Sequence, residues 1–227
     1  MLAMASAALE MIKLHYYPGT AAMVPHIVLE ELGVPYERVL VDRAAGAHKR
    51  ADYLRLNPNG LLPALQEGEL TLYETAAITL HLCDSHAAAG LAPALGTTER
   101  AHFYKWLVWL TNTLQATLIT YFYPDRWVAE GDEAAASALK RKAESKIAGM
   151  LEQLDAHIAN NSGPWFLGRE YSAVDAYVFT LCRWTRNFAN ERRARDYPHL
   201  GPYLQRVLAR PAVQRVMQNE GLAPPFV

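Results

Sequence analysis

Strand-like and helix-like segments alternate along this 227-residue chain up to about residue 86, and no strand-like segment follows. Apolar residues repeat at every second position in the strand-like segments and at helical spacing in the others. Strands are expected at 12–17, 36–42, 63–66 and 70–74, and helices at 25–32 and 75–86. The last two strands flank a Glu-Gly turn, so we expect them to form a hairpin. The strand–helix alternation before them predicts a parallel pair with a right-handed crossover.

The order β-α-β-α-β-β-α predicts a thioredoxin-like α/β domain in the N-terminal part of the chain. From Glu99 onward the apolar residues keep helical spacing, which predicts an all-α helical-bundle C-terminal domain. The expected division is a domain at 11–88, a linker at 89–98 and a helical domain at 99–227. Within the helical part, Ser172-x-x-Asp175 matches a capping box with Asp in place of Glu, and Pro211 is expected to separate the last two helices.

Composition narrows the classes of partner. The chain has 22 basic and 23 acidic residues and no basic stripe, so nucleic acid is not an expected partner. Its apolar runs are shorter than a membrane span needs, and segment 1–10 lacks the basic start of a signal peptide. Cys83 and Cys182 are the only cysteines and lie far apart, which predicts a reducing, cytoplasmic location.

The segment 56–65, "LNPNGLLPAL", places Pro63 at the start of an expected strand, although proline cannot donate a ladder hydrogen bond. Twelve residues later, Thr75 begins an expected helix, where a hydroxyl and free backbone N–H groups form an anion pocket. Each feature alone has a simpler explanation, because prolines punctuate loops and threonines cap many helices. Together, at this spacing, they favour a ligand site.

The pair "NPNGLLPAL" and "LYETAAITLHL", followed by "WFLGREYSAVDAYVF", resembles the glutathione transferases over nearly the whole chain from Met11. The resemblance implies a cis Leu62–Pro63 peptide bond, which leaves the backbone of Leu62 to bind the cysteinyl part of glutathione as an added strand. It implies that Thr75 binds the γ-glutamyl carboxylate and that Glu74 meets the α-ammonium group. His48 and Lys49 are either contacts of the glycine carboxylate or a solvated surface pair.

The expected catalytic task is to hold the glutathione thiol as a thiolate, because a free thiol is mostly protonated at neutral pH. "KLHYYPGTAAMVPHI" is most similar to the bacterial cysteine-type pattern "YxPGACS", but Ala21 and Ala22 replace its cysteine and serine. Thr20 is our first candidate donor. The backbone N–H groups of Ala21 and Ala22 are a second possibility, and Tyr16 or Tyr17 a third, although each tyrosine is more readily explained as structural.

Gln115 stands where the cysteine-type enzymes place a histidine near the sulfur. The aromatic stretch 118–127, with Tyr121 and Tyr123, predicts either a wall for an apolar co-substrate or helix packing. The segment 81–86 contains two histidines, a cysteine and an aspartate, but their spacing on one helix does not converge on a metal, so none is expected. No Cys-x-x-Cys motif is present, which excludes dithiol chemistry on the protein itself.

The expected function is a transferase that conjugates glutathione, as co-substrate, to small hydrophobic electrophiles in detoxification. Two alternatives are a non-catalytic glutathione-binding or interaction module, and a glutathione-dependent reductase or peroxidase. The resemblance also implies a homodimer. Phe103, Tyr104 and Trp106 exceed what one face of their helix can bury, which favours the same conclusion.

Overall fold

A computed structural model describes residues 11–227; segment 1–10, on which the signal-peptide argument depends, lies outside the described residues. The first half forms a four-stranded sheet in the order β2-β1-β3-β4. Its strands are β1 (Ile12–Tyr16), β2 (Tyr36–Leu40), β3 (Ala64–Glu67) and β4 (Leu70–Tyr73). β1 and β2 are parallel, whereas β3 runs antiparallel to both β1 and β4. This confirms the predicted thioredoxin-like plan and its hairpin.

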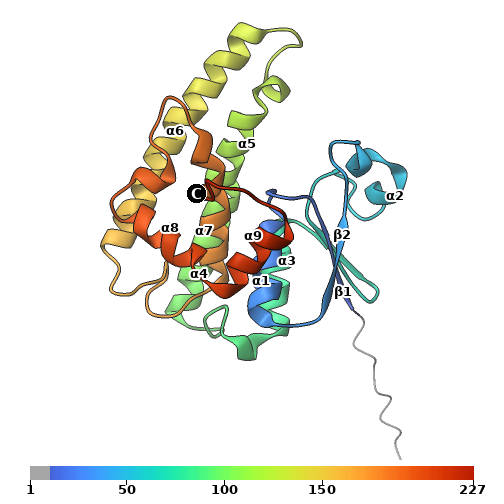
Figure 1. Ribbon diagram of the computed structural model, residues 1–227, viewed down its shortest axis with the longest axis vertical. Helices are drawn as coiled ribbons and strands as arrows, with labels where there is room; N and C mark the ends of the chain where they lie inside the picture. Colours follow the sequence, from blue (N-terminus) through green and yellow to red (C-terminus); the bar gives the residue numbers. More distant parts are fainter. Residues whose placement is uncertain (1–10) are drawn as a thin grey trace, which may run out of the picture.

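The helices of the first half connect these strands. They are α1 (Met23–Leu32), α2 (Ala51–Leu54) and α3 (Thr75–Ser85). α1 ends as predicted at Gly33, whose φ of 66° is left-handed and whose N–H donates to the Leu29 carbonyl. Every α1 residue from Met23 to Leu29 is buried. α1 and α3 lie between the sheet and the helices of the second half, so α1 is covered on all sides (Figure 1).

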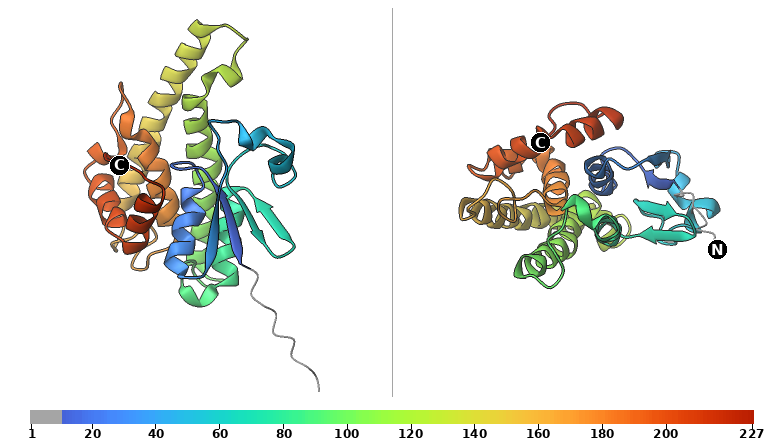
Figure 2. Two further views of the ribbon diagram at one scale, coloured as in Figure 1. Left: turned by 45° about the vertical axis from the view of Figure 1, so that its right-hand side comes forward. Right: turned by 90° about the horizontal axis from the view of Figure 1, so that it is seen from below.

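The second half is entirely helical among the described residues. Its α-helices are α4 (Thr98–Trp109), α5 (Ala116–Phe122), α6 (Glu133–Ala159), α7 (Ala173–Trp184), α8 (Leu200–Leu208) and α9 (Pro211–Asn219). A π-helical segment, η3 (Leu110–Gln115), joins α4 to α5. α5 packs along α6, and the two extend beyond the rest of the molecule (Figures 1 and 2). The predicted all-α second half and the break before Pro211 are confirmed.

α7 is the central helix of the second half and is buried from Ala173 to Arg183. Ser172 and Asp175 form the predicted capping box at its start. The Asp175 carboxylate also accepts hydrogen bonds from the Phe166 N–H and the Tyr203 hydroxyl, each at 2.8 Å. Burial without enough partners would make this carboxylate costly, so these donors allow a charged group at the start of a core helix.

Two sequence-based arguments change in the structure. Phe103 and Trp106 are buried within their own chain, where Trp106 packs against Phe166 at a centroid distance of 4.8 Å. Only Tyr104 of the three aromatic residues stays exposed, so the aromatic surplus that we used to predict a dimer is mostly internal.

The turn η2 (Ala87–Ala89) occupies part of the interval between α3 and α4, and the exact domain boundaries stay a prediction. Among the described helices, none has the length and hydropathy to cross a membrane.

Candidate functional site

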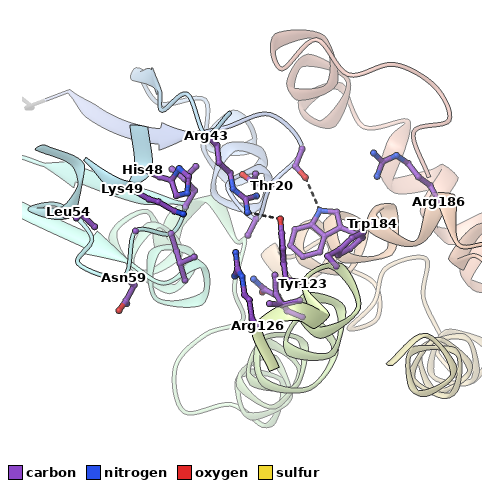
Figure 3. A pocket seen from close by; sticks show the side chains of 18 residues that line it. Thr20, Arg43, His48, Lys49, Leu54, Asn59, Tyr123, Arg126, Trp184 and Arg186 are labelled. Atoms are coloured by element: carbon purple, nitrogen blue, oxygen red, sulfur yellow. Dashed lines mark hydrogen bonds between the residues drawn. The ribbon is translucent and has the colours of Figure 1, made fainter. Parts of the chain in front are cut away.

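A cavity of about 690 Å³ lies where the two halves of the chain meet (Figure 3). One wall comes from loops of the thioredoxin-like half, and the other from the helical half. The lining residues of the first wall are Gly19, Thr20, Ala21, Arg43, His48, Lys49, Leu54 and Asn59 to Leu62. Those of the second are Gln115, Ile119, Phe122, Tyr123, Arg126, Trp184 and Arg186.

The loop after β1 is held by the helical half through a single glycine. Gly19 has a φ of 71°, a left-handed conformation that favours glycine. Its N–H donates to Glu220 Oε2 at 2.8 Å, and its carbonyl accepts a hydrogen bond from Trp184 Nε1 at 3.0 Å. Both backbone groups of Gly19 are therefore satisfied by side chains distant in sequence, which places the following residues, Thr20 and Ala21, at the cavity.

Glu220 also joins the loop to α1. Its Oε1 accepts a hydrogen bond from His26 Nδ1 at 2.7 Å, and both side chains are buried. The Glu220 carboxylate, directly after α9, therefore connects the C-terminal segment both to the loop that carries Gly19 and to α1, which carries His26. A buried carboxylate with paired donors is costly to disrupt, because removing it leaves its donors without partners.

Three groups of this loop that we considered as thiolate donors differ in their availability. The Thr20 hydroxyl donates to the Tyr17 carbonyl at 2.7 Å, so its proton is already engaged. The Ala22 N–H makes a long contact of 3.4 Å with Thr20 Oγ1, and Ala22 is buried outside the cavity lining. Ala21 lines the cavity, and within the described part of the chain its N–H has no hydrogen-bond acceptor.

The loop before β3 presents backbone rather than side chain. The Leu62–Pro63 peptide bond is cis. The preceding carbonyl, that of Leu61, accepts hydrogen bonds from the Tyr53 hydroxyl at 2.6 Å and from Asn57 Nδ2 at 2.8 Å. Leu62 lines the cavity, and its own N–H and carbonyl have no partner among residues 11–227. Pro63 is buried behind it.

Glu74 and Thr75 lie at the start of α3, outside the cavity lining. Glu74 is the N-cap and Thr75 the first helical residue, so the helix begins where the sequence predicts it. Glu74 is exposed and has a φ of 72°, which is rare for a residue other than glycine. Thr75 is buried. The side chains therefore mark a helix N-terminus suited to an anion, but they do not face the main cavity.

Part of the second wall comes from α5 and from the turn that follows it. Ile119 and Phe122 lie three residues apart on α5 and line the cavity, and Tyr123 at the end of that helix and Arg126 in the turn after it continue the wall. Tyr121 falls on another face and packs against Phe188 at a centroid distance of 4.5 Å. The structure therefore supports Tyr123 as a lining residue and places Tyr121 in the core. Gln115 also lines the cavity, and its Oε1 accepts a hydrogen bond from the Tyr177 hydroxyl at 2.5 Å.

Positive charge gathers on both walls. Arg43 Nη2 donates to the Tyr123 hydroxyl at 2.7 Å, and the Arg126 guanidinium lies 4.1 Å from the centroid of the same ring (Figure 3). His48 and Lys49, predicted as a pair, both line the cavity beside them. The His48 pKa is lowered, first by burial and then by the positive charges of Arg43, Lys49 and Arg126.

Other candidates lie elsewhere. Tyr16 is in the core, near His26 and Arg38, and does not reach the cavity. The histidines of segment 81–86 have other partners: His81 pairs with Glu67 at 2.7 Å, and His86 contacts the Leu82 carbonyl at 3.1 Å. Within residues 11–227, no cluster of three His, Cys, Asp or Glu side chains converges on a common point.

The protein's own thiols are remote from this chemistry. Cys83 and Cys182 are both buried and unpaired with each other. Burial raises the pKa of the Cys83 thiol to about 12 and raises that of Cys182 as well. Neither thiol is a nucleophile near neutral pH, because the thiolate is the reactive form.

Four side chains that line the cavity or hold its loop were not singled out in the sequence analysis: Glu220, Trp184, Arg43 and Arg126. Glu220 and Trp184 act on a glycine 201 and 165 residues away, and no local pattern indicates such contacts. Arg126 lies inside the aromatic stretch 118–127, where its charge is visible in the sequence but its direction is not. Arg43 stands in the polar stretch after β2 without a distinguishing neighbour.

Comparisons with known proteins agree with this geometry. The family model described as glutathione S-transferase, N-terminal domain, matches residues 10–84, and the glutathione S-transferase C-terminal domain matches residues 119–220. The glutathione S-transferase GST-4.5 of Xanthomonas campestris is 30% identical over 210 residues, covering 92% of this chain and 99% of that protein.

Solved structures give the same result. A glutathione transferase homologue from Sulfitobacter with bound glutathione has a TM-score of 0.83 and 28% identity, covering 94% of this chain and 99% of that one. A bacterial beta class glutathione S-transferase from Sphingomonas chungbukensis has a TM-score of 0.78 and 30% identity, covering 93% and 100%. This chain therefore belongs to the glutathione S-transferase family of enzymes.

Proposed function

We propose that this enzyme binds glutathione against its thioredoxin-like wall and conjugates the thiolate to small electrophiles held by the helical wall. The observation that carries this proposal is one cavity that joins the unpaired backbone of Leu62, the Gly19–Ala21 loop and the apolar side chains of Ile119, Phe122 and Trp184. An extended peptide can pair with a free backbone edge such as that of Leu62. The bound glutathione of the Sulfitobacter homologue supports the same ligand here.

In this proposal the backbone N–H of Ala21 is the first donor to the thiolate. It lines the cavity, precedes the start of α1 and has no acceptor among the described residues. A helix N-terminus favours an anion, and preorganised backbone donors stabilise one without reorganisation. Thr20 remains a second candidate, but its hydroxyl must release the Tyr17 carbonyl before it can donate. The lowered thiol pKa then raises the concentration of the nucleophile.

The two carboxylates and the ammonium group of glutathione also have candidate contacts in the thioredoxin-like half. Lys49 lines the cavity and is our candidate for the glycine carboxylate. Thr75 and the first N–H groups of α3 are our candidates for the γ-glutamyl carboxylate, with Glu74 for the ammonium group. Gln115 and Tyr123 would contact the electrophile from the helical side.

Calorimetry with glutathione and turnover of a neutral aryl chloride test this function together. We expect binding at millimolar glutathione or below, and release of chloride at a rate above the uncatalysed reaction. Binding without turnover of aryl halides, isothiocyanates, hydroperoxides or mixed disulfides would favour the binding module instead. Turnover confined to the last two classes would favour a reductase or peroxidase.

We also propose a cytoplasmic homodimer. Tyr104 and Val108 of α4 are 39% and 55% exposed, and they belong to a shallow apolar groove with Trp109. Apolar side chains of β4, Leu70 and Tyr73, are also exposed. A second copy of the chain would cover such surfaces, and two-fold pairing is the commonest assembly. Light scattering at micromolar protein concentration should give twice the monomer mass. A monomer mass at that concentration would refute the homodimer.

A further inference from the structure

We infer that the electrophile is an anion, an apolar or aromatic body that carries a carboxylate, and that Arg43 and Arg126 bind this carboxylate from the two walls of the cavity. The inference rests on the proposed conjugation and names the substrate class of the same site. It narrows the hydrophobic electrophile expected from the sequence to a charged one.

The charge balance of the cavity carries the first step. Four permanent cations line it, namely Arg43, Lys49, Arg126 and Arg186. Among the described lining residues there is no aspartate or glutamate. The whole chain is nearly neutral, with 22 basic and 23 acidic residues, so this excess is local. A cavity lined by one sign of charge concentrates ligands of the opposite sign.

These cations also lack a carboxylate partner among the described residues. None of the four forms an ion pair within the described part of the chain. Asp42 and Asp125 are their neighbours in sequence, but neither lines the cavity. Asp42 accepts the Ala45 N–H at 3.0 Å instead. The arginines are therefore available to an incoming carboxylate.

The geometry places two of them together. Arg43 comes from the thioredoxin-like half and Arg126 from the turn after α5, and their guanidinium groups lie 5.3 Å and 4.1 Å from the Tyr123 ring centroid. Figure 3 shows both beside Tyr123, with Arg43 hydrogen-bonded to its hydroxyl. Arg43 keeps further N–H donors, and the Arg126 guanidinium donates no hydrogen bond among residues 11–227. A guanidinium pair of this kind suits a carboxylate.

Glutathione alone does not account for all of the charge. Its two carboxylates have candidate sites at Lys49 and at the start of α3, which leaves Arg43 and Arg126 for another anion. Beside them, Phe122 and Trp184 form an apolar surface, with ring centroids 6.2 Å apart. A charged group next to an aromatic body matches this combination.

The reaction is an aromatic substitution. The glutathione sulfur, as thiolate, forms a C–S bond with the ring carbon that bears chlorine, and the C–Cl bond breaks so that chloride leaves with the electron pair. The thiol proton goes to solvent. No oxidant or reductant is needed, and the ring carboxylate does not change during the reaction.

Two matched aryl chlorides test the inference: a chlorodinitrobenzene with both nitro groups beside the chlorine, and the same compound with a carboxylate opposite the chlorine. After subtraction of the uncatalysed rates, we expect a KM about tenfold lower for the carboxylated compound, the effect of a charge-assisted hydrogen bond. High salt should reduce this preference, because the site is partly exposed. Equal KM values would overturn the inference.

The variant Arg126→Gln should remove most of the preference, so that the KM values of the two compounds become nearly equal. Arg141→Gln, on the exposed face of α6, is the control and should keep the preference. If Arg126→Gln instead raises KM for both compounds equally, or raises KM for glutathione alone, the arginine serves glutathione and the inference is wrong.

Binding of the two S-aryl glutathione products, made without enzyme, separates this inference from the proposed function. If neither aryl chloride is turned over, the conjugation proposal fails. Tighter binding of the carboxylated product, lost in Arg126→Gln, would still support the anion site. Equal affinities, or no binding of either product, would overturn it.

Discussion

The two walls of the cavity use different parts of the polypeptide. Beside the side chains of Arg43, His48 and Lys49, the thioredoxin-like wall presents backbone: the N–H and carbonyl of Leu62 and the N–H of Ala21, which have no partner among the described residues. The helical wall presents side chains, chiefly Phe122, Tyr123 and Arg126. Backbone groups are the same at every residue, so the first wall suits a constant ligand, glutathione. Side chains can change without altering a helix, so the second wall suits a ligand that varies between relatives.

The largest expected effect comes from Asp175, which supports the helical wall from within. Asp175→Asn replaces two acceptor oxygens by one and turns an amide toward buried donors, including the Phe166 N–H and the Tyr203 hydroxyl. We expect a loss of about 3 kcal/mol in the free energy of unfolding, and a melting temperature lower by about 6–12 °C. Thermal denaturation followed by circular dichroism measures it, with the exposed Asp125→Asn as control. A change under about 0.5 kcal/mol would contradict the role of the capping carboxylate.

Glu220 holds the loop of the thioredoxin-like wall from the helical half, so its loss should displace that loop. In Glu220→Gln the amide can accept from only one of Gly19 and His26, and the loop that carries Ala21 loses a fixed position. We expect about 2 kcal/mol less stability and kcat about tenfold lower, because small displacements at a reacting centre are costly. The loss should be the same for every electrophile. A loss that depends on the electrophile would mean that Glu220 acts on the helical wall alone.

A pair of truncations compares the walls directly. Phe122→Ala removes a ring that is 43% exposed, so we expect KM for the electrophile to rise about fivefold while KM for glutathione stays unchanged. Leu62→Ala keeps the backbone that we propose pairs with glutathione, and should change KM for glutathione by less than about twofold. Steady-state kinetics with each substrate varied in turn gives all four values. A large glutathione defect in Leu62→Ala would show that the first wall also depends on side chains.

The smallest expected effect is at Thr20. Because its hydroxyl donates to Tyr17, Thr20→Val should raise the pKa of the bound thiol by less than about half a unit. Thr20→Ser keeps the hydroxyl and controls for packing. A rise above about one unit in the valine variant, absent in the serine variant, would make Thr20 the main donor.

The same contrast explains what could be predicted from the sequence. The order of strands and helices along the chain, the hairpin, the Gly33 cap and the Ser172–Asp175 box depend on local backbone rules, and all are found in the structure. The Leu62–Pro63 loop belongs to this class, because its signal is a proline at a strand start. The hydrogen bond that fixes Gly19 could not be predicted from local rules, because its acceptor, Glu220, is 201 residues away.

Which side chains face the cavity was harder to predict, because helical phase decides it. The π-helical segment η3 lies directly before α5 and shifts the phase expected from a regular helix. Tyr121 and Tyr123 therefore could not be distinguished within one aromatic stretch. Phe103 and Trp106 were assigned to an interface for a similar reason, since the partners that bury Trp106, His157 and Phe166, come from distant segments.

The central claim is that backbone donors at the cavity hold glutathione as a thiolate in a chain that lacks the usual cysteine. The most direct measurement is the ultraviolet absorbance of the bound thiolate, titrated against pH with saturating glutathione and with the protein's own tyrosine signal subtracted. The account predicts a thiol pKa at least about one unit below that of a free thiol, near 8.5. A bound thiol that titrates with the pKa of free glutathione would contradict it, and would leave the chain as a glutathione-binding protein without an activated nucleophile.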